Sequence, residues 1–259
     1  MTRISVELVP RDIEVLKEEV KTIKEKLSDV DFINIPDLLS CDTRSWDGAN
    51  IAKAYFDDVV PHLRAMDFDF TKELPIKDKL REYNIKEVLV VEGDPPQSML
   101  YQVYPTISTD IIKKFSEEMP EITVYAGIDQ YRSSMKEEEY RIRRKQLAGA
   151  KGFFTQPFFD MRYLEMYADL LDGLDIYWGV SPVLSERSVS YWRNKNNVIF
   201  PKDFEPTLEW NIEFASKVID FARKHNHNVY LMPIKAKIMP YLEGCLLYTS
   251  PSPRDGATS

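Results

Sequence analysis

Three polar side chains lie in stretches where their chemistry is unusual. Glu7 lies inside the apolar run "ISVELVP", Asp94 ends the run in "VVEGDPP", and Gln156 stands among aromatic residues in "FFTQPFFD". An isolated carboxylate is costly to bury, and burial raises its pKa. Glu7 is therefore predicted to be a proton donor near neutral pH, unless it reaches solvent or a lysine at the end of its strand.

Asp94 and Gln156 each allow two interpretations. Asp94 is placed to face a ligand, because Pro95 and Pro96 restrict the loop that carries it. The same Gly-Asp-Pro-Pro sequence is also ordinary turn chemistry. The amide of Gln156 could hydrogen-bond a planar heterocycle, or it could satisfy backbone groups in the core.

The segments that must position these residues alternate between strand and helix patterns. Eight short apolar runs are typical of parallel strands covered on both faces, and they span residues 3–10, 31–37, 59–67, 87–94, 122–129, 152–160, 175–182 and 228–234. Helical patterns lie between them at residues 11–30, 108–119, 136–150, 161–173 and 207–226. Repeated strand–helix alternation favours a parallel sheet.

This alternation predicts an α/β fold, a (β/α)8 TIM barrel, as a single domain over residues 1–244. An open doubly wound sheet is the alternative, but no GxGxxG turn follows the first strand. The last helix is expected to begin in "KIMPYLEG" and to be truncated. The segment 245–259 matches a sequencing-library adapter read in frame, so we expect a non-native, disordered tail. A natural Ser/Pro-rich tail is the alternative.

Composition narrows the class of partner. The net charge of -8 argues against nucleic acid and anionic membranes as partners. No apolar run approaches the roughly 20 residues of a membrane span, and the first residues lack the apolar core of a secretory signal. Two cysteines allow no disulfide framework, so we expect a soluble, cytoplasmic protein.

The ends of the eight predicted strands carry most of the polar candidates. In a (β/α)8 barrel, ligands bind at the carboxyl ends of the strands. These ends carry Glu7, Asp37, His62, Arg64, Asp94, Asp129, Gln156 and Ser181. The sequence therefore predicts a small-molecule site there, and no metal site.

Five motifs in chain order resemble one known family. "ISVELVP", "VPHLRAMD", "EVLVVEGDPP", "GAKGFFTQPFFD" and "IYWGVSPV" are similar to the strand motifs of the 5,10-methylenetetrahydrofolate reductase family, over residues 3–235. The resemblance implies an oxidoreductase of one-carbon metabolism and methionine biosynthesis. Such an enzyme carries hydride from NAD(P)H through FAD to methylenetetrahydrofolate and forms methyltetrahydrofolate.

The resemblance also implies roles for individual residues. Glu7 matches the general acid, which protonates a folate ring nitrogen and opens the five-membered ring to an iminium. Asp94 matches the aspartate that binds the pterin and influences the flavin, and Gln156 matches a pterin contact. His62, Ala126 and Lys145 match positions at the flavin, with Lys145 near its phosphates.

The flavin side departs from the family pattern. Glu92 stands where the family has an arginine, Pro36 replaces a threonine, and "GIDQYRSS" (127–134) replaces the usual loop. An acid beside a diphosphate repels it, although Arg132, Arg141 or Lys145 could compensate. Two alternatives follow, a folate-binding subunit that acts with a partner protein and a flavin-independent reductase. A homo-oligomer is also compatible with the sequence.

Two other candidates are interpreted without function. His225 and His227 resemble a spaced metal pair, but they precede the eighth predicted strand, and we interpret them as a solvated loop. Cys41 has no evident base beside it and is not proposed as a nucleophile.

Overall fold

The computed structural model describes residues 2–96, 98, 100–234 and 238–247 of the chain. Eight parallel strands pair in chain order, and β8 closes onto β1. The strands are β1 (Ile4–Glu7), β2 (Phe32–Ile35), β3 (Val59–Arg64), β4 (Glu87–Val91), β5 (Thr123–Ile128), β6 (Gly152–Pro157), β7 (Ile176–Val180) and β8 (Asn228–Leu231). The predicted (β/α)8 barrel is confirmed.

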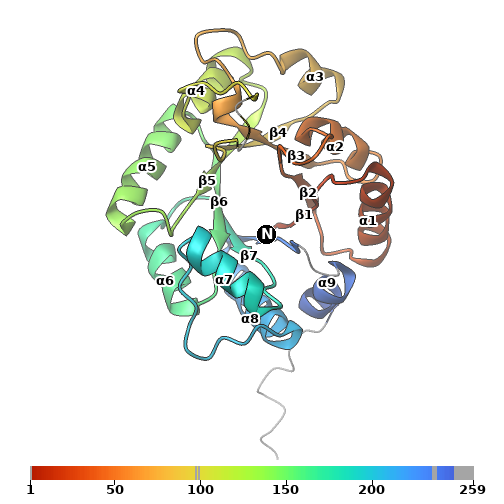
Figure 1. The fold of residues 1–259 in the computed structure, drawn as a ribbon, viewed down its shortest axis with the longest axis vertical. Helices are drawn as coiled ribbons and strands as arrows, with labels where there is room; N and C mark the ends of the chain where they lie inside the picture. The colour runs from red at the N-terminus through yellow and green to blue at the C-terminus, as the bar shows by residue number, and fades with distance from the viewer. Residues whose placement is uncertain (1, 97, 99, 235–237, 248–259) are drawn as a thin grey trace, which may run out of the picture.

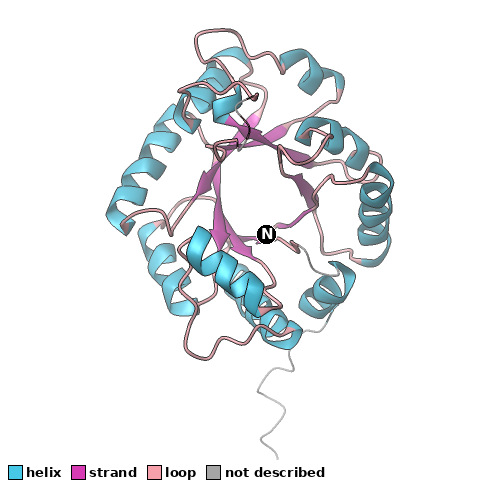
Figure 2. Cartoon of the chain, in the orientation of Figure 1, coloured by secondary structure: helices cyan, strands magenta, loops and turns pink. Residues whose placement is uncertain are grey.

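Helices surround this ring of strands (Figures 1 and 2). They are α1 (Ile13–Lys26), α2 (Ser45–Ala52), α3 (Lys77–Glu82), α4 (Ser108–Glu118), α5 (Met135–Ala148), α6 (Met161–Leu170), α7 (Glu186–Lys195), α8 (Leu208–His225) and α9 (Ile238–Leu247), with a 3-10 turn η1 (Ala65–Asp67). α1 illustrates how the local sequence determines the start and the buried face of a helix. Asp12 accepts hydrogen bonds from the amides of Glu14 and Val15 at its start, and one face buries Leu16 and Val20.

Two apolar layers follow from the alternation of side chains along each strand. Val6, Ile33 and Val90 belong to the large layer shared with the helices. Phe154 and Tyr177 belong to the smaller layer inside the barrel, where their rings stack at 4.1 Å. The strands are apolar on both faces, which is why they appear in the sequence as continuous apolar runs.

Arg3 closes the amino-terminal end of the barrel. Its Nη1 donates to Glu87 at 3.3 Å and to the hydroxyls of Tyr125 and Tyr177 at 3.2 and 3.1 Å. This network links strands β4, β5 and β7 below the aromatic layer. The interior is therefore filled at this end, so a ligand enters from the carboxyl ends of the strands.

The last helix differs from the prediction. α9 runs to Leu247, with Cys245 and Leu246 buried, so disorder is wrong for residues 245–247. These apolar residues continue the buried face of the helix, and Gly244 lies against Ile212 of α8. Residues 248–259 lie outside the described residues.

The interpretation of the two histidines also needs correction. His225 is exposed at the end of α8, but His227 is partly buried and accepts a hydrogen bond from Trp178 Nε1 at 2.9 Å. His227 therefore joins the packing between β7 and α8 and is not a solvated loop residue. Among the described residues, no group of three or more His, Cys, Asp or Glu side chains could hold a metal ion.

Candidate active site

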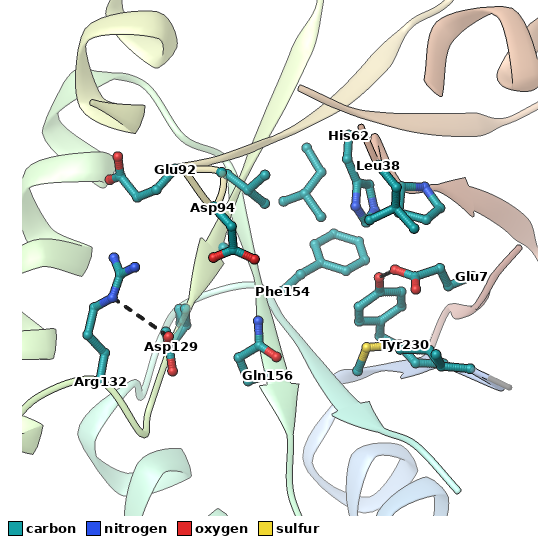
Figure 3. Close-up of a pocket in the computed structure, with 18 of the residues that line it drawn as sticks. Glu7, Leu38, His62, Glu92, Asp94, Asp129, Arg132, Phe154, Gln156 and Tyr230 are labelled. Atoms are coloured by element: carbon teal, nitrogen blue, oxygen red, sulfur yellow. Dashed lines mark hydrogen bonds and ion pairs between the residues drawn. The ribbon is translucent and has the colours of Figure 1, made fainter. Parts of the chain in front are cut away.

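A cavity of about 360 Å³ opens at the carboxyl ends of the strands. Glu7 from β1, Asp94 from the loop after β4 and Gln156 from β6 all line it (Figure 3). Its volume falls within the range of small-molecule sites. Three residues separated by up to 149 positions therefore meet at one end of the barrel.

Glu7 is held deep in this cavity. Val6 and Leu8 point to the helical layer, so the side chain between them points into the barrel. The hydroxyl of Tyr230 on β8 donates a hydrogen bond to Glu7 Oε2. Burial raises the pKa of Glu7 to about 7, while the bonds from Tyr230 and the charge of Arg11 oppose that rise. Glu7 can thus give or take a proton near neutral pH.

Asp94 sits at the exposed mouth of the cavity on a constrained loop. Gly93 has a φ of 87°, a conformation that side-chain-bearing residues rarely adopt, and a Cβ there would lie 3.1 Å from Arg64. Arg64, buried at the end of β3, donates from Nη2 to the backbone oxygen of Asp94 at 2.7 Å. The Asp94 carboxylate is thereby positioned while it stays open to a ligand.

Gln156 is exposed in the cavity and does not serve the core. That task falls to Gln130, which is buried. Gln130 Nε2 donates to the backbone oxygen of Gln156 at 2.7 Å, and Gln130 Oε1 accepts from the backbone N–H of Gln156 at 3.1 Å. Of the two interpretations from sequence, the structure excludes the one in which the side chain of Gln156 satisfies backbone groups.

The three residues that the resemblance assigns to a flavin differ from one another in their position relative to the cavity. His62 is buried and lines the cavity, and burial lowers its pKa to about 3, so the ring is neutral. Its Nε2 has no hydrogen-bond partner among the described residues. Ala126 does not line the cavity, because its side chain packs in the helical layer. Any contact from Ala126 to a ligand would have to come from its backbone.

Lys145 does line the cavity, on its α5 side. Its Nζ donates to the backbone oxygen of Gly127 at 2.6 Å. Burial lowers its pKa, against the opposing charge of Glu138. Glu138 itself is buried, and its Oε2 has no partner in the described part of the chain. The other charged lining residues here are Glu92, Asp129, Arg132 and Arg141.

This side of the cavity does not fit a diphosphate. Glu92 Oε1 and Oε2 accept from the hydroxyl and amide of Ser108, at 2.6 and 3.1 Å. Ser108 begins α4, so a carboxylate of the chain occupies a helix start where a phosphate could otherwise bind. Arg132 lies 3.8 Å from Asp129, and Arg141 is paired with Glu137 at 2.7 Å. The two arginines are thus paired with acids of the same chain, and Lys145 donates to a backbone oxygen.

Two strand-end residues named from sequence form hydrogen bonds away from the cavity. Asp37 accepts from Arg44 at 2.9 and 2.5 Å, and the Ser181 hydroxyl donates to the Met232 oxygen at 2.8 Å. Both stabilise loops at the rim. Neither lines the cavity.

Tyr230 and Trp192 are among the lining residues that were missed from sequence. Tyr230 lies in the eighth apolar run, "NVYLMPI", and a polar group inside an apolar strand run was a usable signal. Trp192 reaches the cavity from α7, which lies in front of β7 and α8 in Figure 1. No sequence pattern indicated that α7 approaches the site.

Comparison with known proteins supports the resemblance found in the motifs. No protein-family profile matches the chain. A 5,10-methylenetetrahydrofolate reductase of Buchnera aphidicola is 22% identical over 147 residues, 55% of this chain. The resemblance to that reductase family is confirmed. The chain spans about half the length of the curated relative it matches, since the alignment covers 50% of that protein.

Solved structures agree on the fold. An uncharacterised protein from Clostridium thermocellum that binds two copies of 5-methyl-5,6,7,8-tetrahydrofolic acid superposes with a TM-score of 0.62 at 14% identity, covering 95% of this chain and 93% of that one. A 2,3-dimethylmalate lyase superposes with a TM-score of 0.60 at 10% identity, covering 93% and 77%. At these identities the likeness establishes the barrel alone.

The described helices were also compared with the requirements of a membrane span. None of them combines the length and apolar character that crossing a membrane needs.

Proposed function

We propose that the chain binds a reduced folate in the cavity and reduces 5,10-methylenetetrahydrofolate to 5-methyltetrahydrofolate with NAD(P)H as hydride donor. The observation that carries the proposal is the meeting of Glu7, Asp94 and Gln156 in one cavity. The similarity to a methylenetetrahydrofolate reductase supports it. So does the fold shared with a protein that binds methyltetrahydrofolate.

The cavity offers complementary groups to a pterin. A pterin carries several hydrogen-bond donors along one edge, and the carboxylate of Asp94 accepts such bonds. The amide of Gln156 both donates and accepts. Phe154, buried in the barrel interior, lines the cavity and supplies apolar contact for the ring.

Glu7 would supply the proton that the reaction consumes. Its carboxyl group protonates a nitrogen of the five-membered ring, the ring opens to an iminium at the other nitrogen, and hydride adds to the methylene carbon. The products are the N-methyl group, oxidised nicotinamide and the Glu7 carboxylate. The hydrogen bond from Tyr230 stabilises that carboxylate.

No step is assigned to a flavin. Glu92 at the start of α4 and the paired arginines favour direct transfer from the nicotinamide over binding of an FAD diphosphate. The same observation favours a second candidate, a folate-binding subunit that passes the one-carbon unit to a partner protein. Both candidates use the same pterin contacts.

The test is an anaerobic assay of methylenetetrahydrofolate reduction with NADH or NADPH, with and without added FAD. We expect turnover of colourless protein that added FAD does not increase, and its loss in Glu7→Gln. Folate binding without turnover would favour the folate-binding subunit. Absence of folate binding by calorimetry would refute both candidates.

A further inference from the structure

Glu7 lines two cavities. The second is smaller, about 100 Å³, and lies between the start of α1 and the residues around the end of β8 and the start of α9. At about 30 Å³ for each water, it has room for several water molecules. Arg11, Asp12, Val15 and Glu19 line it, together with apolar residues such as Ile234 and Ile238.

This cavity connects the acid to the protein surface. Arg11, Asp12 and Val15 are exposed, so the outer end is open to solvent. Glu19 follows Val15 by four positions and therefore lies on the same face of α1. It is partly buried, and burial raises its pKa while the charge of Arg11 opposes the rise. A carboxyl group of this kind can bind and release a proton between water and the interior.

A ligand in the main cavity would prevent solvent from reaching Glu7 through that cavity. Glu7 is only 8% exposed, and the side chains near it include neutral His62, Tyr230 and Asn34, which pairs with Glu7 in the β1–β2 register. Each turnover of the proposed reaction leaves Glu7 as a carboxylate. As long as a folate stays bound, this proton can be replaced only along a path that the folate does not occupy.

We propose that the second cavity is the route by which Glu7 exchanges protons with solvent while a folate fills the main cavity, with Glu19 carrying the proton. This inference rests on the proposed function. A proton leaves the Glu19 carboxyl, passes through water in the cavity and binds the Glu7 carboxylate. Glu19 then takes a proton from solvent, and no other bond changes.

Among the described residues, the charged side chains that line this cavity besides Glu7 come from two segments. Arg11 and Asp12 belong to the connection between β1 and α1, and Glu19 belongs to α1. The wall around the end of β8 and the start of α9 contributes Pro233, Ile234 and Ile238, which do not titrate. Arg11 lines the same cavity as both carboxyl groups, Glu7 and Glu19.

The test follows protonation of Glu7 directly. The infrared band of its protonated carboxyl, identified by its loss in Glu7→Gln, is recorded after a jump from about pH 8.5 to about pH 6, across its pKa of about 7. The jump is applied to the free protein and to its complex with 5-methyltetrahydrofolate. Glu19→Gln removes the carrier, Val15→Trp fills the passage, and Glu18→Gln changes an exposed acid of the same helix as the control.

In the folate complex, we expect Glu19→Gln and Val15→Trp to slow protonation roughly a hundredfold, the lower end of the range for a positioned acid–base group. Glu18→Gln should match the wild type, and all variants should be alike in the free protein, where the main cavity is open. Equal rates for all variants in the complex would overturn the route. Slowing in the free protein as well would also overturn it, because it would indicate a general structural effect. If 5-methyltetrahydrofolate does not bind, the proposed function is wrong, and the proton route that rests on it is wrong as well.

Discussion

The burial of Glu7 makes folding stability depend on pH in a specific way. The folded-state pKa of about 7 lies above the ordinary value of 4.5. Between these values the folded chain holds a proton that the unfolded chain has lost, so this contribution is complete below the lower value and is lost as pH rises through the upper one. The difference corresponds to about 3 kcal/mol in total, of which about 2 kcal/mol disappears between about pH 5.5 and about pH 8.5.

Glu7→Gln should remove this dependence, because the amide stays neutral at every pH. Urea unfolding at the two pH values is expected to show that the wild type loses about 2 kcal/mol more stability than Glu7→Gln as pH rises. Glu18→Gln, which replaces an exposed acid on α1, should show the same pH dependence of stability as the wild type. Parallel stability changes for the wild type and Glu7→Gln would show that Glu7 is solvated in the folded protein, and the reasoning about its role as a proton donor would be wrong.

Three further changes test the parts around the site. Arg64→Ala should weaken binding of 5-methyltetrahydrofolate at least roughly tenfold in calorimetry, because the bond that positions Asp94 is charge-assisted; unchanged affinity would remove Asp94 from the ligand contacts. Gly93→Ala should lower the free energy of unfolding by about 1–2 kcal/mol in urea, because φ is 87° there; a neutral effect would mean that the loop relaxes. Arg3→Met should destabilise the barrel by about 2 kcal/mol in thermal unfolding, because half-buried Glu87 would lose its charge-assisted bonds to Arg3 and keep only the one from Tyr125, and an unchanged melting temperature would contradict this.

Much of the barrel could be predicted because its strands are buried on both faces. The run "EVLVV" is apolar at successive positions, since Val88 and Val90 face helices while Leu89 faces the barrel interior. The helices with a clear apolar stripe, such as α1, were equally visible. α2, α3 and α7 were missed, because they are short and polar or contain glycine, and packing determines their formation more than intrinsic propensity does.

The candidate site was predictable only in part. The position of a polar residue at the end of an apolar strand indicated Glu7, Asp94 and Gln156, and all three line the cavity. The same criterion also selected Asp37, which is paired with Arg44 instead. A strand end fixes the height of a residue in the barrel, but the direction of its side chain depends on neighbours from other strands.

The sequence by itself therefore determined the eight strands, their order and the burial of one acid in the first of them. The folded chain decided what surrounds that acid. Tyr230 reaches Glu7 only because β8 closes onto β1, across more than 220 positions of sequence. Glu92 bonds to the start of α4, because unpaired amides there attract it. Such contacts depend on pairings between distant segments, and local patterns of residue type do not encode which partner each side chain meets.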